Sequence, residues 1–211
     1  MQVQQILNKT QDIEGLTFLQ FARLLNLELP MDLTHAKGWI GQAIEKYLGA
    51  KAGSLPIPDF PDLNLELKTL PLNHQAKASE STYVTTLPLI GHLNLIWERS
   101  ACYQKLQQVL WVLIEGEKTI PYHQRRIIKA ILWKPSPQQL EILKRDWETI
   151  TEMVIQGEVE KIHGGIGEYL HIRPKASDSL MTTRSINEQG QIIQTIPKGF
   201  YLRTKLTNQI F

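Results

Sequence analysis

The sequence has a single cysteine, Cys102, among 211 residues, and it has no long apolar run. A lone cysteine excludes intramolecular disulfides and zinc sites built from several cysteines, and it is typical of a reducing cytoplasm. No segment approaches the roughly 18 consecutive apolar residues that would span a bilayer. The first residues, Met1–Gln5, carry neither the basic nor the apolar region of a secretory signal. We therefore expect a cytoplasmic protein without a membrane partner.

The chain also has little net charge, only +2, so the overall balance does not indicate a nucleic-acid partner. The distribution is more informative. From Arg99 to Lys134 there are seven basic residues and two acidic ones, and from Lys198 to the end there are three basic residues and no acid. A locally basic surface suits contact with phosphates, although such surfaces are also common on proteins that bind no nucleic acid.

The spacing of apolar residues predicts an α/β fold with a mixed sheet in one catalytic unit spanning residues 1–211. Helical periodicity covers Gly38–Leu48 and ends at Gly49, and a capping box at Ser136–Gln139 opens a second helix that ends near Gly157. Alternating or continuous apolar residues predict strands at residues 63–69, 82–87, 109–114, 127–133 and 169–173. Two shorter helical patterns lie in the first thirty residues.

The segment from Pro58 to Lys68 contains the side chains that phosphodiester hydrolysis needs. Glu66 and Lys68 are two residues apart on a predicted strand, so both leave the same face, while the alternate leucines face the core. Asp59, on the preceding loop, can fold back to complete a Mg²⁺ site with Glu66, because Mg²⁺ is commonly held by one or two carboxylates and water. The alternative is an ordinary charge pair on a solvated strand face.

Other charged residues are weaker candidates. Glu45 lies at the edge of the apolar stripe of the 38–48 helix, where it could point into a site or be a surface residue. Lys105 precedes a buried strand, where it could reach a phosphate or be solvated. The six histidines show no metal-ligand spacing, and the run Gly164–Gly167 lacks the lysine of a phosphate-binding loop, so we interpret it as a turn.

Several short motifs occur together, in order and at consistent spacing. They are Lys37–Gly41, Glu45, Leu48–Ala50, Ala52–Ser54, Asp59–Phe60, Glu66–Thr69, Lys105–Leu106, Val109–Trp111, Glu115–Glu117, Ile120–Pro121, Asp146–Glu148, Ile172–Ala176 and Gly199–Leu202. With these motifs the chain, from about Leu16 to Phe211, resembles the MutH family of mismatch-repair nicking enzymes. The resemblance implies a restriction-endonuclease-like mixed sheet flanked by helices, of the PD-(D/E)xK kind, with two lobes forming a DNA-binding cleft.

The resemblance also assigns roles. Asp59, Glu66 and Glu45 correspond to metal-binding carboxylates, and Lys68 to the lysine that positions or activates the attacking water. Lys105 corresponds to a further active-site lysine. The resemblance places Arg173 and Lys175 in a motif that meets DNA, and Tyr201 near the adenine N6 atom where methylation is sensed. From the residues alone, Tyr201 could instead be a core aromatic between Phe200 and Leu202.

The activity that the resemblance implies is Mg²⁺-dependent nicking, with Mn²⁺ as a substitute, 5′ to the G of GATC on the unmethylated strand of hemimethylated DNA. It implies a monomer that is activated by a MutL-type partner together with MutS. Two alternatives remain: a stand-alone GATC restriction endonuclease, and a DNA-binding module without catalysis. The sequence departs from the family pattern in ending soon after Leu206, where members continue with a further helix, and in residues 177–184, where it has Asp178 and Met181.

Overall fold

The computed structural model describes residues 2–30, 38–53, 55–91, 96–175 and 181–211. The chain divides into two compact units, one of residues 1–79, 107–134 and 210–211, and the other of residues 80–106 and 135–209. No described helix is long and apolar enough to cross a membrane. The predicted motif residues Lys37 and Ser54, and the stretch around Asp178, lie outside the described residues.

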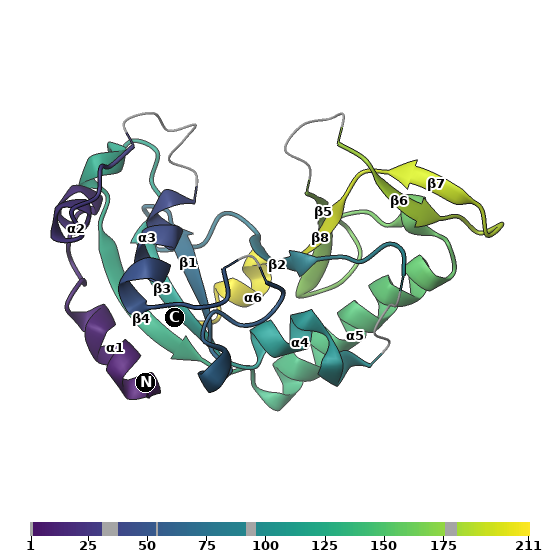
Figure 1. Ribbon diagram of the computed structural model, residues 1–211, viewed down its shortest axis with the longest axis horizontal. Coiled ribbons are helices and arrows are strands. Elements are labelled where there is room, and N and C mark those ends of the chain that lie inside the picture. The colour runs from purple at the N-terminus through teal and green to yellow at the C-terminus, as the bar shows by residue number, and fades with distance from the viewer. Residues whose placement is uncertain (1, 31–37, 54, 92–95, 176–180) are drawn as a thin grey trace. The chain divides into compact units, whose positions relative to one another are not determined.

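The first unit is a mixed three-stranded sheet covered by helices (Figure 1). The sheet order is β1-β3-β4, with β1 parallel to β3 and β4 antiparallel to it. The strands are β1 Glu66–Leu72, β3 Val109–Glu115 and β4 Ile127–Trp133, and the helices are α1 Val3–Gln11, α2 Phe18–Leu24 and α3 Trp39–Leu48, with short 3-10 turns η1 Pro61–Leu63 and η3 Tyr122–Gln124. The predicted α/β class and mixed sheet are confirmed.

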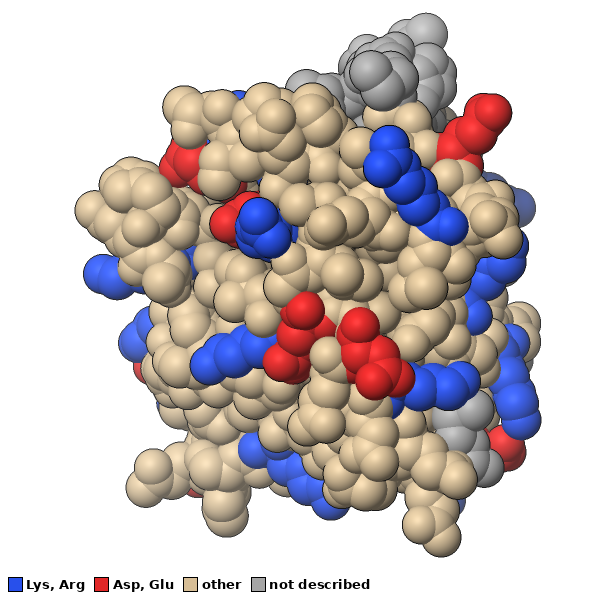
Figure 2. All heavy atoms as spheres, turned by 90° about the vertical axis from the view of Figure 1, so that its left-hand side faces the viewer, with Lys and Arg blue, Asp and Glu red and all other residues tan. Residues whose placement is uncertain are grey.

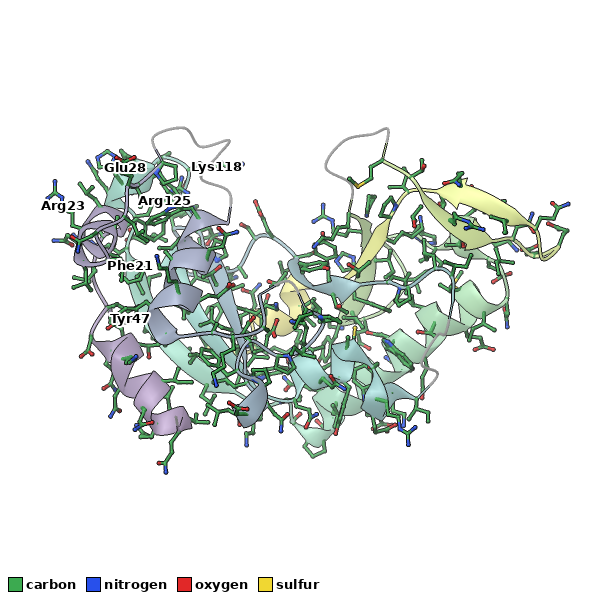
Figure 3. The ribbon with its side chains drawn as sticks, viewed as in Figure 1. Phe21, Arg23, Glu28, Tyr47, Lys118 and Arg125 are labelled. Atoms are coloured by element: carbon green, nitrogen blue, oxygen red, sulfur yellow. The ribbon has the colours of Figure 1, made fainter. Side chains whose placement is uncertain are left out.

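One core cluster joins the three helices to one face of this sheet. Apolar residues of α1, α2 and α3 pack with Leu67 of β1 and with Leu110 and Val112 of β3. The ring of Phe21 on α2 meets that of Tyr47 on α3 edge to face, with centroids 5.7 Å apart (Figure 3). Because side chains alternate along β1, its other face carries Glu66 and Lys68.

The second unit is built around the three-stranded antiparallel sheet β2-β8-β5 and the long helix α5. Its elements are β2 Thr82–Thr86, η2 Trp97–Arg99, α4 Ala101–Leu106, α5 Pro137–Ile155, η4 Val159–Lys161, β5 Leu170–Pro174, β8 Lys198–Leu202, α6 Thr204–Thr207, and a separate hairpin of β6 Thr183–Ile186 and β7 Ile192–Thr195. Ser136 caps α5 through the predicted capping box, since its side chain accepts the N–H of Gln139.

One expectation needs correction. The strand predicted from Leu63 begins only at Glu66, because Pro61–Leu63 forms a 3-10 turn and Asn64 adopts a left-handed conformation with φ of 47°. Lys105 precedes the buried strand β3, as the sequence indicates, and belongs to the short helix α4. Leu63 still packs against the core, so the later start of the strand does not expose its apolar side chain.

Candidate active site

Strand β1 presents a buried carboxylate and a lysine side by side. Glu66 is only 1% exposed, and the Nζ atom of Lys68 donates to its Oε1 atom at 2.7 Å. Leu65 and Leu67, which alternate with these residues, anchor the strand in the core. The alternative of a solvated charge pair is therefore excluded for Glu66. Removing an ionised carboxylate from water is costly unless partners compensate, so such a group at this depth is typical of a functional site.

Asp59 lies at the edge of the same strand. Phe60 and Leu65 form an antiparallel bridge, in which the N–H of Phe60 donates to the carbonyl of Leu65 at 2.9 Å. This turn folds the chain back, so that Oδ2 of Asp59 accepts the N–H of Leu67 at 2.9 Å. The N–H of Glu66 donates in the opposite direction, to the carbonyl of Gln108. Asp59 therefore occupies the outer edge of β1, one residue along the strand from Glu66.

The carboxylate oxygens of Asp59 and Glu66 fit a hard divalent cation by their chemistry. Mg²⁺ prefers such oxygens and needs only one or two protein carboxylates, because water and substrate phosphate complete its coordination. Within the described ranges, no group of three or more His, Cys, Asp or Glu side chains is arranged to hold a metal ion. A metal site here would consequently depend on the Asp59–Glu66 pair together with non-protein ligands.

Glu45 approaches β1 from the helical side. Gly41, one turn earlier on α3, packs so closely that a Cβ atom there would lie 3.7 Å from Oγ1 of Thr69. The segment after α3 then runs beside the loop that carries Asp59, since the N–H of Lys51 donates to the carbonyl of Asp59 at 2.8 Å. Glu45 is half-buried between these two contacts. Its predicted place among the metal ligands stays a prediction.

Lys105 lies on α4, in the second unit. It is 8% exposed, an unusual depth for a lysine. Its charge counteracts the effect of burial on Cys102, whose pKa is nevertheless raised well above its ordinary value by desolvation. Cys102 is accordingly an unreactive buried thiol, while the predicted active-site role of Lys105 stays a prediction.

The predicted DNA-contacting residues of the second unit gather on one face of its sheet. Arg173 and Lys175 are exposed at the end of β5, and Tyr201 is half-buried on β8. The guanidinium of Arg173 lies 6.0 Å from the ring centroid of Tyr201. The core-aromatic alternative for Tyr201 fails because Phe200 and Leu202 occupy the buried face, 1% and 0% exposed, which turns Tyr201 to the other side.

Two residues that the sequence did not single out complete this face. Tyr83 on β2 and His171 on β5 are the cross-strand neighbours of Tyr201. The ammonium of Lys175 lies 3.1 Å from the centroid of the Tyr83 ring, a cation–π contact. Gly199 leaves room for that ring, because a Cβ atom there would lie 2.9 Å from Cε2 of Tyr83. Lysine, arginine and aromatic side chains interleaved on a sheet suit contact with a phosphate backbone and bases.

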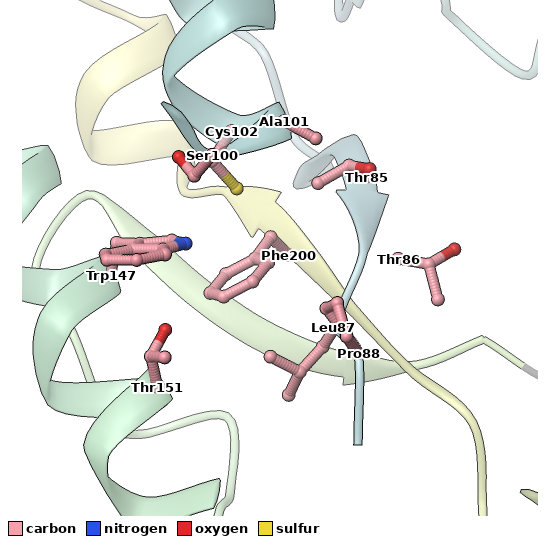
Figure 4. Close-up of a pocket in the computed structure, with 10 residues that line it drawn as sticks. All are labelled: Thr85, Thr86, Leu87, Pro88, Ser100, Ala101, Cys102, Trp147, Thr151 and Phe200. Carbon is pink, nitrogen blue, oxygen red and sulfur yellow. The ribbon is translucent and has the colours of Figure 1, made fainter. Parts of the chain in front are cut away.

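Two other regions of the described residues are weaker candidates for binding a metal ion or a phosphate. An apolar cavity of about 80 Å³ lies behind β8 in the second unit, beside Phe200 and Trp147 (Figure 4). Its lining includes neither a carboxylate that would suit a divalent cation nor a lysine or arginine that would suit a phosphate. On the face drawn in Figure 2, lysine and arginine are interspersed with acids and form no continuous basic stripe. Strand β1 is therefore the candidate for the chemistry, and the basic and aromatic face of β2-β8-β5 is the candidate for binding.

A mixed sheet flanked by helices, with two acids and a lysine at its edge strand, defines the restriction-endonuclease-like fold. Comparison with known proteins identifies the family within that class. Residues 48–146 match the family model described as "DNA mismatch repair enzyme MutH", a range that includes Asp59, Glu66, Lys68 and Lys105. The chain belongs to the MutH family.

Named relatives support this assignment over almost the whole chain. The "DNA mismatch repair protein MutH" of Pasteurella multocida is 45% identical over 98% of this chain and 93% of the relative. The proteins of the same name from Shewanella baltica and Serratia proteamaculans are 46% and 43% identical, over 98% of this chain and 92% and 91% of their own lengths.

Proposed function

We propose that this protein is a Mg²⁺-dependent DNA endonuclease of mismatch repair. It nicks the unmethylated strand of hemimethylated DNA 5′ to the G of GATC, acting as a monomer under the control of a MutL-type partner and MutS. The observation that carries the proposal is the buried Asp59–Glu66 pair beside the ammonium of Lys68, at the edge of β1. Membership of the MutH family supports the mismatch-repair role and the GATC substrate.

Asp59 and Glu66 would hold the metal ion, which when bound would polarise the phosphoryl oxygen and lower the pKa of a water molecule. Asp59 is held in place by the N–H of Leu67, and Glu66 by its position on the rigid strand. The ammonium of Lys68 donates to the attacking water or to a non-bridging phosphate oxygen. The water oxygen bonds to phosphorus as the bond to the 3′-oxygen breaks, which leaves 3′-hydroxyl and 5′-phosphate ends.

The second sheet would select the substrate. Arg173 would donate two hydrogen bonds to a guanine, and Lys175 would contact the phosphate backbone. The half-buried ring of Tyr201 would lie near adenine N6, where a methyl group on the cleaved strand would meet it. These assignments follow the MutH pattern at matching positions, and the interleaved aromatic and basic face of β2-β8-β5 supports them.

The metal-site assignment is tested with Asp59→Asn and Glu66→Gln. Asparagine keeps an oxygen that accepts the N–H of Leu67, so the change removes charge while preserving the local fold. We expect both variants to lose at least about 100-fold in nicking rate in Mg²⁺, because a charged metal ligand is lost, while DNA affinity is retained. The matched control is Asp62→Asn, which alters an exposed carboxylate paired with Lys51 and should leave the rate unchanged. Normal nicking by either site variant would contradict the assignment.

A further inference from the structure

His171 occupies a constrained position beside the proposed methylation sensor. It lies on β5, directly opposite Tyr201 of β8, and is 6% exposed. The two rings meet edge to face with centroids 6.4 Å apart, and Tyr201 meets Tyr83 on its other side at 5.3 Å. The ring of Tyr201 therefore stands between two aromatic neighbours, one from each flanking strand.

The hydrogen bonds of His171 specify one neutral form of the ring. Its Nδ1 atom lies 3.2 Å from the carbonyl oxygen of Gly164, and its Nε2 atom lies 2.9 Å from Oγ of Ser81. A carbonyl oxygen can only accept, so Nδ1 carries the proton and donates it. The remaining lone pair on Nε2 then accepts the hydroxyl hydrogen of Ser81. Both ring nitrogens are satisfied in this way while His171 is uncharged and the Ser81 hydroxyl donates.

The surroundings oppose a second proton on this ring. Burial lowers the pKa of His171, and the positive charges of Arg203 and Arg173 lower it further, although the Gly164 carbonyl raises it. The guanidinium of Arg203 donates to the same carbonyl of Gly164. A proton on Nε2 would turn this atom into a donor, so the Ser81 hydroxyl would have to rotate, and it would add a cation beside two arginines.

We propose that His171 is a positioning residue for strand choice: in its neutral form it holds the Tyr201 ring in the orientation that senses adenine methylation. This proposal rests on the proposed function. Protonation of His171 makes Nε2 a donor, which reverses the Ser81 hydrogen bond, and it repels Arg173, which also faces Tyr201. Selection of the unmethylated strand therefore weakens as the pH falls through the pKa of this histidine.

The test is the strand-choice ratio measured within a single hemimethylated GATC duplex. The two strands carry different fluorophores, and nicks in each are counted in Mg²⁺ with enzyme in excess. The ratio cancels the pH dependence of the chemical step and the amount of folded enzyme, because both strands meet the same active site. We expect the wild-type ratio to fall at least ~3-fold between about pH 8 and about pH 5, a range that extends well below the ordinary histidine pKa because burial and the two arginines lower the pKa of His171.

Two variants separate positioning from titration. In His171→Gln the amide can replace both hydrogen bonds but cannot titrate, and in His171→Phe the ring is kept without the hydrogen bonds. Neither ratio should change with pH, but the ratio should stay high in His171→Gln and low in His171→Phe, which lacks the two hydrogen bonds that hold the ring. The matched control His74→Gln removes an exposed histidine of the first unit and should keep the wild-type pH dependence.

The outcomes distinguish this proposal from the one on which it rests. A ratio in the wild type that does not depend on pH, or an equal pH dependence in His171→Gln and the wild type, would overturn the role of His171 while leaving the nicking activity in place. Nicking of neither strand at any pH would overturn the proposed function, and with it the proposal for His171.

Discussion

At the scale of single residues, the Glu66–Lys68 ion pair has to serve both the fold and the reaction. Glu66 is almost inaccessible, and the ammonium of Lys68 at 2.7 Å offsets part of the cost of burying its charge. The exposed Lys51–Asp62 pair has nearly the same length, 2.9 Å, but both of its side chains are largely in water. Two ion pairs of similar length therefore contribute differently to stability, because solvent screens the Lys51–Asp62 pair and is largely excluded from the Glu66–Lys68 pair.

Lys68→Ala should therefore slow nicking and also lower the free energy of unfolding by about 2–3 kcal/mol, since the buried carboxylate of Glu66 loses an ammonium partner. Added Mg²⁺ should restore part of that stability, because the cation would neutralise Glu66. Lys51→Ala, the matched surface change, should cost less than about 1 kcal/mol. Urea unfolding with and without Mg²⁺ measures both values. Equal losses in the two variants would contradict the buried-pair account.

Arg173 lies on β5 and Lys175 directly follows that strand, yet we expect them to recognise different parts of DNA. Arg173→Ala should reduce the preference for GATC over a scrambled site by about 1–3 kcal/mol, the value of a bidentate contact to guanine. Lys175→Ala should weaken binding to both sequences equally, because phosphate contacts carry no sequence information. Competition binding with both duplexes measures the two effects. Equal loss on the two sequences in Arg173→Ala would make Arg173 a phosphate contact only.

At the scale of elements, one carboxylate on α5 fixes where β5 begins. Asp146 is 3% exposed, and its Oδ2 atom accepts the N–H groups of Glu168, Tyr169 and Leu170 at 2.9, 2.7 and 2.9 Å. On the other side of the glycine-rich turn, the Arg203 guanidinium donates to the carbonyls of Ile166 and Gly167. Together they set the start of the strand that carries His171 and Arg173.

Asp146→Ala should lower the free energy of unfolding by about 3 kcal/mol or more, because it leaves three backbone donors without their charged acceptor. Asp146→Asn keeps one acceptor oxygen and should lose roughly half as much. Urea denaturation followed by tryptophan fluorescence measures the difference. A loss below about 1 kcal/mol in the alanine variant would show that β5 is held by other contacts.

Local periodicity predicts the elements whose burial pattern is regular. Helix α3 ends at Gly49 with φ of 82°, β3 is buried almost throughout, and α5 starts at its capping box, all as the sequence predicts. Irregular elements are not predicted. Helix α4 has only six residues, too few to display a helical period, and the left-handed Asn64 interrupts an alternation that is continuous in sequence.

The same distinction, between what local periodicity predicts and what it does not, applies to the candidate site. Glu66 and Lys68 are two residues apart on one strand, so their proximity follows from the period of a strand. Tyr83 and His171 reach Tyr201 only through the register of three strands that are distant in sequence. No local pattern fixes such a register, and nothing in the sequence around Ser81 or Gly164 indicates the hydrogen bonds that hold His171.

At the scale of the whole molecule, the part of the chain that the structure describes contains one Asp59–Glu66–Lys68 set, and the chain belongs to the MutH family. A single set acting as a monomer hydrolyses one phosphodiester bond for each binding event. This predicts nicks rather than double-strand breaks, and it distinguishes the proposed function from that of a restriction endonuclease, which would pair two sets to cut both strands.

The most direct measurement of this central claim is cleavage of a plasmid with one GATC site, prepared unmethylated, hemimethylated and fully methylated, in Mg²⁺ with and without a MutL-type activator. We predict slow nicking of the unmethylated strand that the activator accelerates, with no cleavage of fully methylated DNA, after chelation of Mg²⁺, or by Asp59→Asn. Efficient double-strand breaks without a partner would indicate a restriction enzyme. Intact binding without cleavage, even with the activator, would contradict the account and leave a DNA-binding protein without nuclease activity.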